Sequence, residues 1–225
     1  MHSDLPPGQR LIDKLPRFGL GKFAHRFPNT DNAAEIDIGG DVGQPVKLSI
    51  PFGDLNRVVQ VSDFHCVTTW TACGISWSGF RFSEFYKELV VNLAQPEPSV
   101  EFVVFGGQDG YKVGMHLEDL LASDVLLADR LDGQALPIAH GAPLRLVAPA
   151  HYGYKSIKHL SRIEFWCKEH AYQHAGFKFM DHPRARVEFE ERGTGLPGRV
   201  YRWLYRPLVK STRRKFAKAL AEHIS

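Results

Sequence analysis

Short β-rich runs separated by turn residues are the feature that most constrains what this chain can fold into. Enrichment in β-branched and aromatic residues predicts strands in five of these runs: 46–50, 57–61, 100–105, 144–147 and 162–166. The pair Asp132-Gly133, within the apolar stretch 125–136, is typical of a tight hairpin. Many strands at close spacing predict a single domain of the mixed α+β class in which strands dominate.

Helical spacing occurs in only a few places. Apolar residues recur at this spacing behind Ser83, which we expect to cap a helix, and Pro96 ends the pattern. A shorter helix is expected at 117–122. The chain as a whole then divides into an irregular arm, a central domain and a C-terminal extension with a basic helix, over residues 1–33, 34–182 and 183–225.

Composition excludes several classes of protein. The 225 residues are 44% hydrophobic and 24% charged, which is ordinary globular usage, and the apolar runs are too short to span a membrane. A net charge of +3 does not indicate a nucleic-acid partner. Three cysteines without a Cys-x-x-Cys pair argue against a disulfide framework. Because the N-terminus also lacks an apolar signal region, we expect a cytoplasmic protein.

The stretch Asp-Phe-His-Cys-Val-Thr-Thr-Trp at 63–70 ends a predicted strand on Cys66. A cysteine at this place can expose its sulfur in a loop, where a thiolate is a suitable ligand for a soft or high-valent metal. Free cysteine is also among the most buried residue types, so a packing role for Cys66 stays open.

A second stretch, residues 140–158, concentrates groups that bind phosphate. Arg145 offers a planar fork of donors, while Lys155 and Lys158 flank the hydroxyl of Ser156 on a loop that contains glycine. The alternative is a basic loop that simply faces solvent.

Together the two stretches resemble the sulfite oxidase superfamily of molybdopterin-binding oxidoreductases, in its bacterial single-domain form. The likeness rests on Phe-His-Cys-Val-Thr-x-Trp, then Asp-Gly-Tyr, then His-Gly-x-Pro-x-Arg-Leu-x-x-Pro-x-x-Tyr-Gly-Tyr-Lys-Ser-x-Lys, in this order between residues 46 and 165. It implies a mixed fold that holds molybdenum on a pterin dithiolene, with neither haem nor zinc. That superfamily also includes the catalytic subunit of the periplasmic methionine-sulfoxide reductase.

The resemblance assigns a role to each matching residue. Cys66 matches the position of the cysteine that is the only protein ligand of the metal in this superfamily, and Tyr111 matches the position of a tyrosine close to the reacting centre. The expected cofactor-binding residues, at the pterin and its phosphate, are His140, Arg145, Lys155, Ser156, Ile157 and Lys158.

This resemblance predicts a molybdenum-cofactor oxidoreductase that transfers an oxygen atom or performs related two-electron chemistry on a small molecule. No arginine follows Cys66 until Arg81, whereas sulfite oxidases have an arginine-rich segment there, so sulfite and sulfoxide-like compounds both remain candidate substrates. A separate electron-transfer partner is expected. The alternatives are a non-catalytic molybdopterin-binding protein and, more remotely, a zinc hydrolase using His65, Cys66, His116 or His140.

The end of the chain is strongly basic. Residues 196–225 contain eight lysines and arginines and one acid residue, a net +7 that leaves −4 for the rest of the chain. Ser211 or Thr212 is expected to cap a helix over 213–224 with Phe216, Leu220 and Ile224 on one face. Such a helix can make a peripheral membrane contact or bind an acidic electron-transfer partner. It can also pack its apolar face on the domain.

Overall fold

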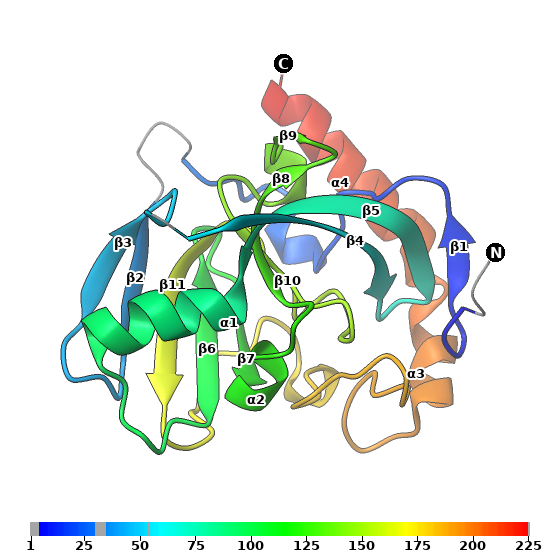
Figure 1. Cartoon of the computed structure of the whole chain (residues 1–225). Coiled ribbons are helices and arrows are strands. Elements are labelled where there is room, and N and C mark those ends of the chain that lie inside the picture. Colours follow the sequence, from blue (N-terminus) through cyan, green and yellow to red (C-terminus); the bar gives the residue numbers. More distant parts are fainter. Residues whose placement is uncertain (1–4, 30–34, 54, 225) are drawn as a thin grey trace.

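Two mixed β-sheets form the body of the protein, and helices lie around them (Figure 1). The computed structural model describes residues 5–29, 35–53 and 55–224. The first sheet has the order β1-β5-β8-β10, with β4 also paired to β5 and β9 to β8. Its strands are β1 (Arg10–Ile12), β4 (Arg57–Cys66), β5 (Trp70–Arg81), β8 (Leu126–Leu131), β9 (Gln134–Ala135) and β10 (Arg145–Val147).

The second sheet has the order β3-β2-β11-β6-β7. Its strands are β2 (Glu35–Gly40), β3 (Val46–Ser49), β6 (Phe102–Gly107), β7 (Lys112–His116) and β11 (Leu160–Trp166). The main hydrophobic core joins the two sheets, since Phe80 and Leu127 of the first sheet belong to the same buried cluster as Phe105 and Ile163 of the second. This burial of both inner faces is the largest stabilising contribution available to the fold.

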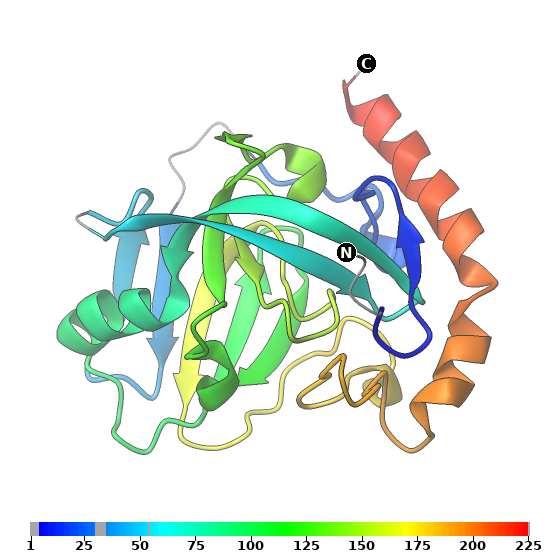
Figure 2. The ribbon, with the colours of Figure 1, turned by 45° about the vertical axis from the view of Figure 1, so that its right-hand side comes forward.

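Helical segments are short except at the C-terminus. The first one runs from α1 (Phe82–Phe85) directly into the π-helical η2 (Tyr86–Ala94), and α2 is Leu117–Leu120. Three 3-10 turns occur at η1 (Gly21–Phe23), η3 (Ile138–His140) and η4 (Lys178–Met180). Figure 2 shows α3 (Gly198–Tyr205) and α4 (Leu208–Ile224) end to end along one side of the molecule, outside both sheets.

The five predicted strands are confirmed as β3, β4, β6, β10 and β11, and the hairpin at Asp132-Gly133 joins β8 to β9. The strands β1, β2, β5 and β7 were not predicted. In β2 and β5, acid residues, glycines and serines interrupt the apolar alternation that signals a strand. The arm therefore is not irregular over Arg10–Ile12, where it pairs in parallel with β5. The predicted domain boundary at 33 lies outside the described residues, and the boundary at 182 stays a prediction.

Two helices begin at other residues than the sequence predicted. The helix expected to be capped by Ser83 begins at Phe82, with Arg81 in the cap position and no side-chain cap bond. The C-terminal helix begins at Leu208, well before Ser211 and Thr212, and α3 precedes it without having been predicted. Packing explains both differences, because tertiary contacts on an apolar face stabilise a helix more than its cap does.

Candidate active site

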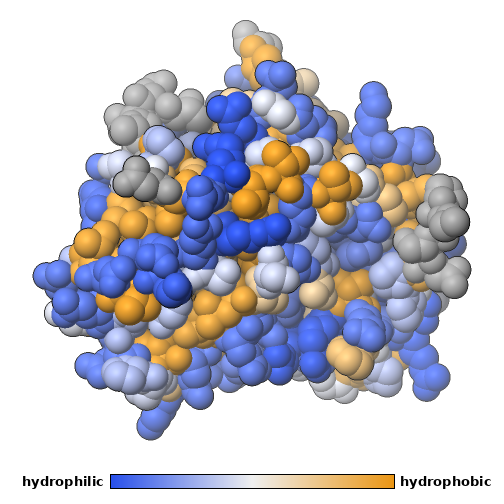
Figure 3. Space-filling model, viewed as in Figure 1, coloured by the Kyte–Doolittle hydropathy of each residue, from blue (hydrophilic) through white to orange (hydrophobic). Residues whose placement is uncertain are grey.

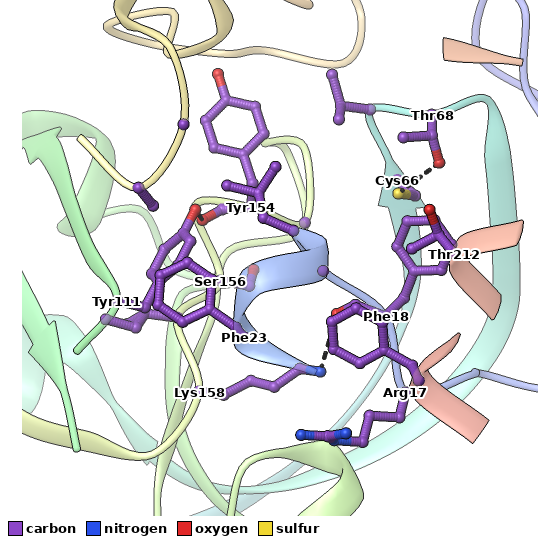
Figure 4. A pocket seen from close by; sticks show the side chains of 18 of the residues that line it. Arg17, Phe18, Phe23, Cys66, Thr68, Tyr111, Tyr154, Ser156, Lys158 and Thr212 are labelled. Carbon is purple, nitrogen blue, oxygen red and sulfur yellow. Dashed lines mark hydrogen bonds between the residues drawn. The ribbon is translucent and has the colours of Figure 1, made fainter. Parts of the chain in front are cut away.

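A cavity of about 310 Å³ brings together parts of the chain that are far apart in sequence (Figure 4). Its lining comes from residues 15–23 of the arm, the β4–β5 hairpin, residues 109–112, the loop 140–159, residues 175–181 and the two C-terminal helices. The sequence-predicted residues Cys66, Tyr111, His140, Arg145, Ser156, Ile157 and Lys158 all line it. This volume lies within the range of small-molecule and cofactor sites.

Cys66 lies at the end of β4, where the chain turns back into β5. A register shift between Ser62 and Phe64 bends the strand just before this turn, and the N–H of Thr69 closes the turn on the Cys66 carbonyl at 3.1 Å. The Cys66 side chain is 8% exposed, and its Sγ lies 3.1 Å from Oγ1 of Thr68. Burial raises the pKa of the thiol to about 11, so a cation has to displace its proton if the sulfur is to act as a ligand.

Arg145 lies in β10 and is 1% exposed. Its guanidinium donates to the carbonyls of His140 at 2.9 Å and Ser156 at 3.1 Å, and it stacks 4.8 Å from the ring of Trp77. These contacts hold the fork in one orientation but supply no negative charge. Burial lowers the pKa of the guanidinium to about 9, which still leaves it cationic at neutral pH.

Lys158 supplies a second cation to the same cavity. Its Nζ donates to the carbonyl of Phe18 in the arm at 3.2 Å. Burial, followed by repulsion from Arg145 and Arg17, lowers the pKa of Lys158 to about 7. A bound anion would reverse this effect, because an opposite charge favours the protonated amine.

The cavity fits an anionic ligand that offers hydrogen bonds. Arg17, Arg145 and Lys158 make no ion pair with a carboxylate anywhere in the described part of the chain. Nδ1 of His140 is buried and has no hydrogen-bond partner there either, and burial lowers the pKa of this ring to about 4, so it is neutral. Buried cations and buried polar atoms without partners are unfavourable, and a phosphate with hydrogen-bonding atoms beside it would satisfy both.

The loop backbone is shaped around these side chains. Gly141 has a φ of +114°, and a Cβ added there would lie 3.0 Å from Cβ of Lys158 and 3.1 Å from Cβ of Arg145. Only glycine tolerates both this conformation and this approach. The residue is therefore required for the two cations to converge.

Ser156 and Ile157 contribute in different ways. The Ser156 hydroxyl accepts a hydrogen bond from the N–H of Ala148 at 3.1 Å, which leaves its own proton available to a ligand. The Ile157 side chain is 2% exposed in the main core, and its N–H donates to the carbonyl of Lys155 at 2.9 Å. Its contribution to the cavity is thus apolar contact.

The structure does not bring Lys155 to the cavity lining. Its Nζ is buried between the carboxylate of Asp181, at 2.9 Å, and the carbonyl of Gly114, at 2.8 Å. Asp181 also accepts hydrogen bonds from the Tyr172 hydroxyl and from His174. The expected contribution of Lys155 to a phosphate site is not supported, since its charge is already neutralised by this carboxylate.

Tyr111 lines the cavity on the side away from Cys66 in Figure 4. Its hydroxyl donates to the carbonyl of Tyr154 at 2.9 Å, and its ring meets that of Phe23 edge to face. Burial, together with the charges of Asp181 and Asp109, raises the pKa of Tyr111 far above its usual value. The hydroxyl is therefore a hydrogen-bond donor and not a base at neutral pH.

Sequence analysis missed the residues that close the cavity at the two ends of the chain. Arg17 and Phe18 come from the arm, and Thr212 and Phe216 come from α4. Phe216 is 3% exposed and its ring lies parallel to that of Phe18 at 6.4 Å. The position of Arg17 between Pro16 and Phe18 was only a weak indication of a binding residue. Nothing in the local sequence indicated that the arm and α4 meet.

Among residues 5–29, 35–53 and 55–224, no group of three histidine, cysteine or acidic side chains could hold a metal ion. Within the same ranges, no helix combines the length and the apolar character that a bilayer crossing requires.

Comparison with known families identifies the family of this chain. The model of the oxidoreductase molybdopterin-binding domain matches residues 25–174. The chain belongs to this family. It is a molybdopterin-dependent oxidoreductase of the sulfite oxidase type, as the resemblance in sequence predicted.

Curated relatives lie in the same family. The uncharacterized oxidoreductase YuiH of Bacillus subtilis is 30% identical over 169 residues, which are 74% of this chain and 81% of YuiH. The protein-methionine-sulfoxide reductase catalytic subunit MsrP of Campylobacter jejuni is 32% identical over 158 residues, 61% of this chain and 50% of MsrP. The MsrP of Xanthomonas axonopodis is 28% identical over 74% of this chain and 59% of its own length. The chain thus spans little more than half of these MsrP subunits.

Among solved structures, the sulfane dehydrogenase SoxCD of Paracoccus pantotrophus has the same fold, with a TM-score of 0.52 at 21% identity over 60% of this chain and 38% of the SoxCD chain. The predicted fold class is thereby confirmed. The family match ends at residue 174, so the lining contributed by 175–181, α3 and α4 lies outside the shared domain.

Proposed function

We propose that this molybdopterin-dependent oxidoreductase transfers an oxygen atom to or from a small substrate, with Cys66 as the protein ligand of molybdenum. The observation that carries the proposal is the pairing, in one cavity, of the Cys66 thiol with cations that lack a carboxylate partner among the described residues. Arg145, Lys158, Ser156 and His140 would hold the phosphate and the adjoining pterin.

When bound, the cofactor would supply a two-electron redox centre that can exchange an oxygen atom with the substrate. The protein's own contribution is to place and shield this chemistry. Cys66 would give up its proton on ligation, and Lys158 would become fully protonated beside the phosphate. Tyr111 would turn its hydroxyl away from the Tyr154 carbonyl to donate a hydrogen bond to a substrate oxygen.

The lining favours a neutral, sulfoxide-like substrate over sulfite. Around Cys66 the lining includes the rings of Phe18, Phe64 and Trp70, and no arginine follows the cysteine until Arg81. Aromatic surface suits an apolar substrate, whereas a small dianion needs several nearby donors. The activity named for the MsrP relatives, reduction of protein methionine sulfoxide, supports the same class. A separate electron-transfer protein would complete the reaction.

The proposal is tested by metal analysis of protein made in a host that synthesises the cofactor. We expect close to one molybdenum and one pterin per chain, loss of both in Cys66→Ser, and full loading in the matched control Cys73→Ser. Arg145→Ala should load poorly. Zinc in place of molybdenum, or normal turnover of an artificial electron acceptor by Cys66→Ser, would overturn the assignment.

Cofactor retention without redox activity towards sulfite, methionine sulfoxide or other S-oxides would instead identify a non-catalytic binding protein. That outcome would reject the catalytic part of the proposal and keep the binding residues.

A further inference from the structure

Large apolar side chains are exposed on α3 and at the start of α4. Trp203 is 75% exposed, Leu208 51% and Leu204 43%, and Leu196 in the preceding loop is 50% exposed. Trp203 differs from Trp70 and Trp77, which are almost fully buried. Exposure of several large apolar residues within thirteen positions is unusual and marks a contact surface.

Basic side chains surround this apolar group. Arg199 and Arg206 stand four positions before and three positions after Trp203, on the same face of α3. Lys210, Arg213 and Arg214 continue the charge along α4. These five side chains are exposed, and within the described residues none of them forms an ion pair. Figure 2 shows both helices following one side of the molecule.

The middle of the apolar face of α4 is covered by the domain. Phe216 and Ala219 are 3% and 1% exposed and pack with Ala24 of the arm. Packing on the domain, one of the expected alternatives for this helix, is therefore found at Phe216, whereas Ile224 at the end of the same face is 71% exposed. The exposed side chains of α4 are mainly charged, so the exposed apolar side chains that could contact a partner come mainly from α3.

This surface borders the mouth of the active-site cavity. Leu208 and Phe177 both line the cavity, and both are more than half exposed. Phe177 stacks on Phe179, which in turn stacks on Tyr201 of α3. Whatever binds Trp203 and its neighbours would therefore lie next to the entrance.

We propose that α3 and the start of α4 dock the protein on an anionic membrane surface. We define this docking surface as Leu196, Arg199, Trp203, Leu204, Arg206, Leu208, Lys210, Arg213 and Arg214. A tryptophan has an apolar ring and a polar N–H, which suits the boundary between lipid tails and headgroups. Arginine and lysine beside it attract acidic headgroups while their carbon chains lie along the apolar layer.

Charge complementarity favours a membrane in particular. The net +7 of residues 196–225 contrasts with −4 for the rest of the chain, so an anionic plane would attract this side and repel the remainder. Val59 and Val61, which are exposed elsewhere, lie on β4 between Arg57 and the acid residue Asp63 instead. On the face shown in Figure 3, apolar atoms are likewise interrupted by hydrophilic ones.

Vesicle co-sedimentation tests the proposal without reference to the cofactor. The probes are vesicles of phosphatidylcholine with 25% phosphatidylglycerol and vesicles of phosphatidylcholine alone, at low and high salt. We expect binding to the acidic vesicles at low salt, at least tenfold weaker binding at high salt or to neutral vesicles, and a blue shift of tryptophan fluorescence on binding. The shift should disappear in Trp203→Phe, because the other tryptophans are already shielded or lie elsewhere.

The double variant Lys210→Glu/Arg214→Glu should lose vesicle binding at least tenfold. The matched control Lys87→Glu/Lys168→Glu reverses the same number of exposed charges outside the docking surface and should bind as the native protein does. All these side chains are exposed, so unchanged circular dichroism is expected. Absence of binding at low salt, or equal binding by the double variant, would overturn the proposal. Binding of the same surface to an acidic redox protein such as flavodoxin, without vesicle binding, would replace it by a protein partner.

Discussion

Replacing Lys158 by methionine should stabilise the cofactor-free protein while it weakens cofactor retention. The native ammonium is held among Arg145 and Arg17 with carbonyl groups as its hydrogen-bond partners. Methionine keeps a similar length and removes the charge. The two opposite effects follow from one cause, because the site is arranged for an anion that the cofactor-free protein does not contain.

The magnitude follows from the pKa of Lys158, which falls from 10.5 to about 7 on folding. At about 1.4 kcal/mol per pKa unit, this shift corresponds to roughly 5 kcal/mol of destabilisation by the charged form. The side chain keeps partial contact with water, so solvent screening reduces the expected gain in Lys158→Met to about 2 kcal/mol.

The sign of the pH dependence is specific. Below pH 7 Lys158 is charged in both the folded and the unfolded chain, so its destabilising effect is complete. Between pH 7 and 10.5 the folded chain binds fewer protons than the unfolded chain, so the native protein gains stability as pH rises. The difference in the free energy of unfolding between Lys158→Met and the native protein should accordingly fall by about half between pH 6.5 and pH 9.

Urea unfolding of protein from a cofactor-deficient host measures this difference at both pH values. Lys87→Met removes a charge that is 81% exposed and paired only with the neighbouring Glu88, so it should change the free energy of unfolding by less than about 0.5 kcal/mol at either pH. Molybdenum analysis of the same variants from a competent host measures retention. A Lys158→Met protein that is less stable than native at pH 6.5, or whose advantage is equal at both pH values, would refute the reasoning.

Three further changes have defined outcomes. Tyr111→Phe should leave the molybdenum content unchanged but lower the turnover number about 10²-fold, as steady-state kinetics with an artificial electron donor would show, whereas native kinetics would remove Tyr111 from the reaction. Asp181→Asn should destabilise the protein by about 3 kcal/mol in urea, because it leaves Lys155 buried without a carboxylate; a loss below about 1 kcal/mol would contradict a buried ion pair. Phe216→Ala should lower stability by about 3 kcal/mol and speed loss of cofactor on dialysis, and stable retention would show that α4 does not close the cavity.

Local patterns in the sequence were sufficient for the parts of the site that lie close together along the chain. Cys66 and its hairpin belong to one short motif, and His140, Arg145, Ser156 and Lys158 belong to another. Each motif folds largely on itself, through a turn at Thr69 and a loop at Gly141. Strand composition was likewise enough to predict the strand-dominated class, although polar and glycine residues hid β2 and β5.

Lys155 shows where local reasoning failed. It adjoins Ser156 in a bend of the loop, where the neighbour's position along the chain does not fix the direction of a side chain. Only the position of Asp181 decides that this ammonium is neutralised away from the cavity. The same limit applies to α3, whose Tyr201 and Tyr205 are buried by the domain while Trp203 is not.

By itself the sequence was enough to single out Cys66 as a candidate metal ligand and to locate the cationic loop and the basic end, because these depend on residue type and on short spacing. Tertiary structure alone decided that the arm and α4 close the cavity, as in the hydrogen bond from Lys158 to Phe18 across 140 positions. Such contacts depend on which apolar faces the folded sheets leave uncovered. That property belongs to the packed molecule, and no local stretch of residues contains it.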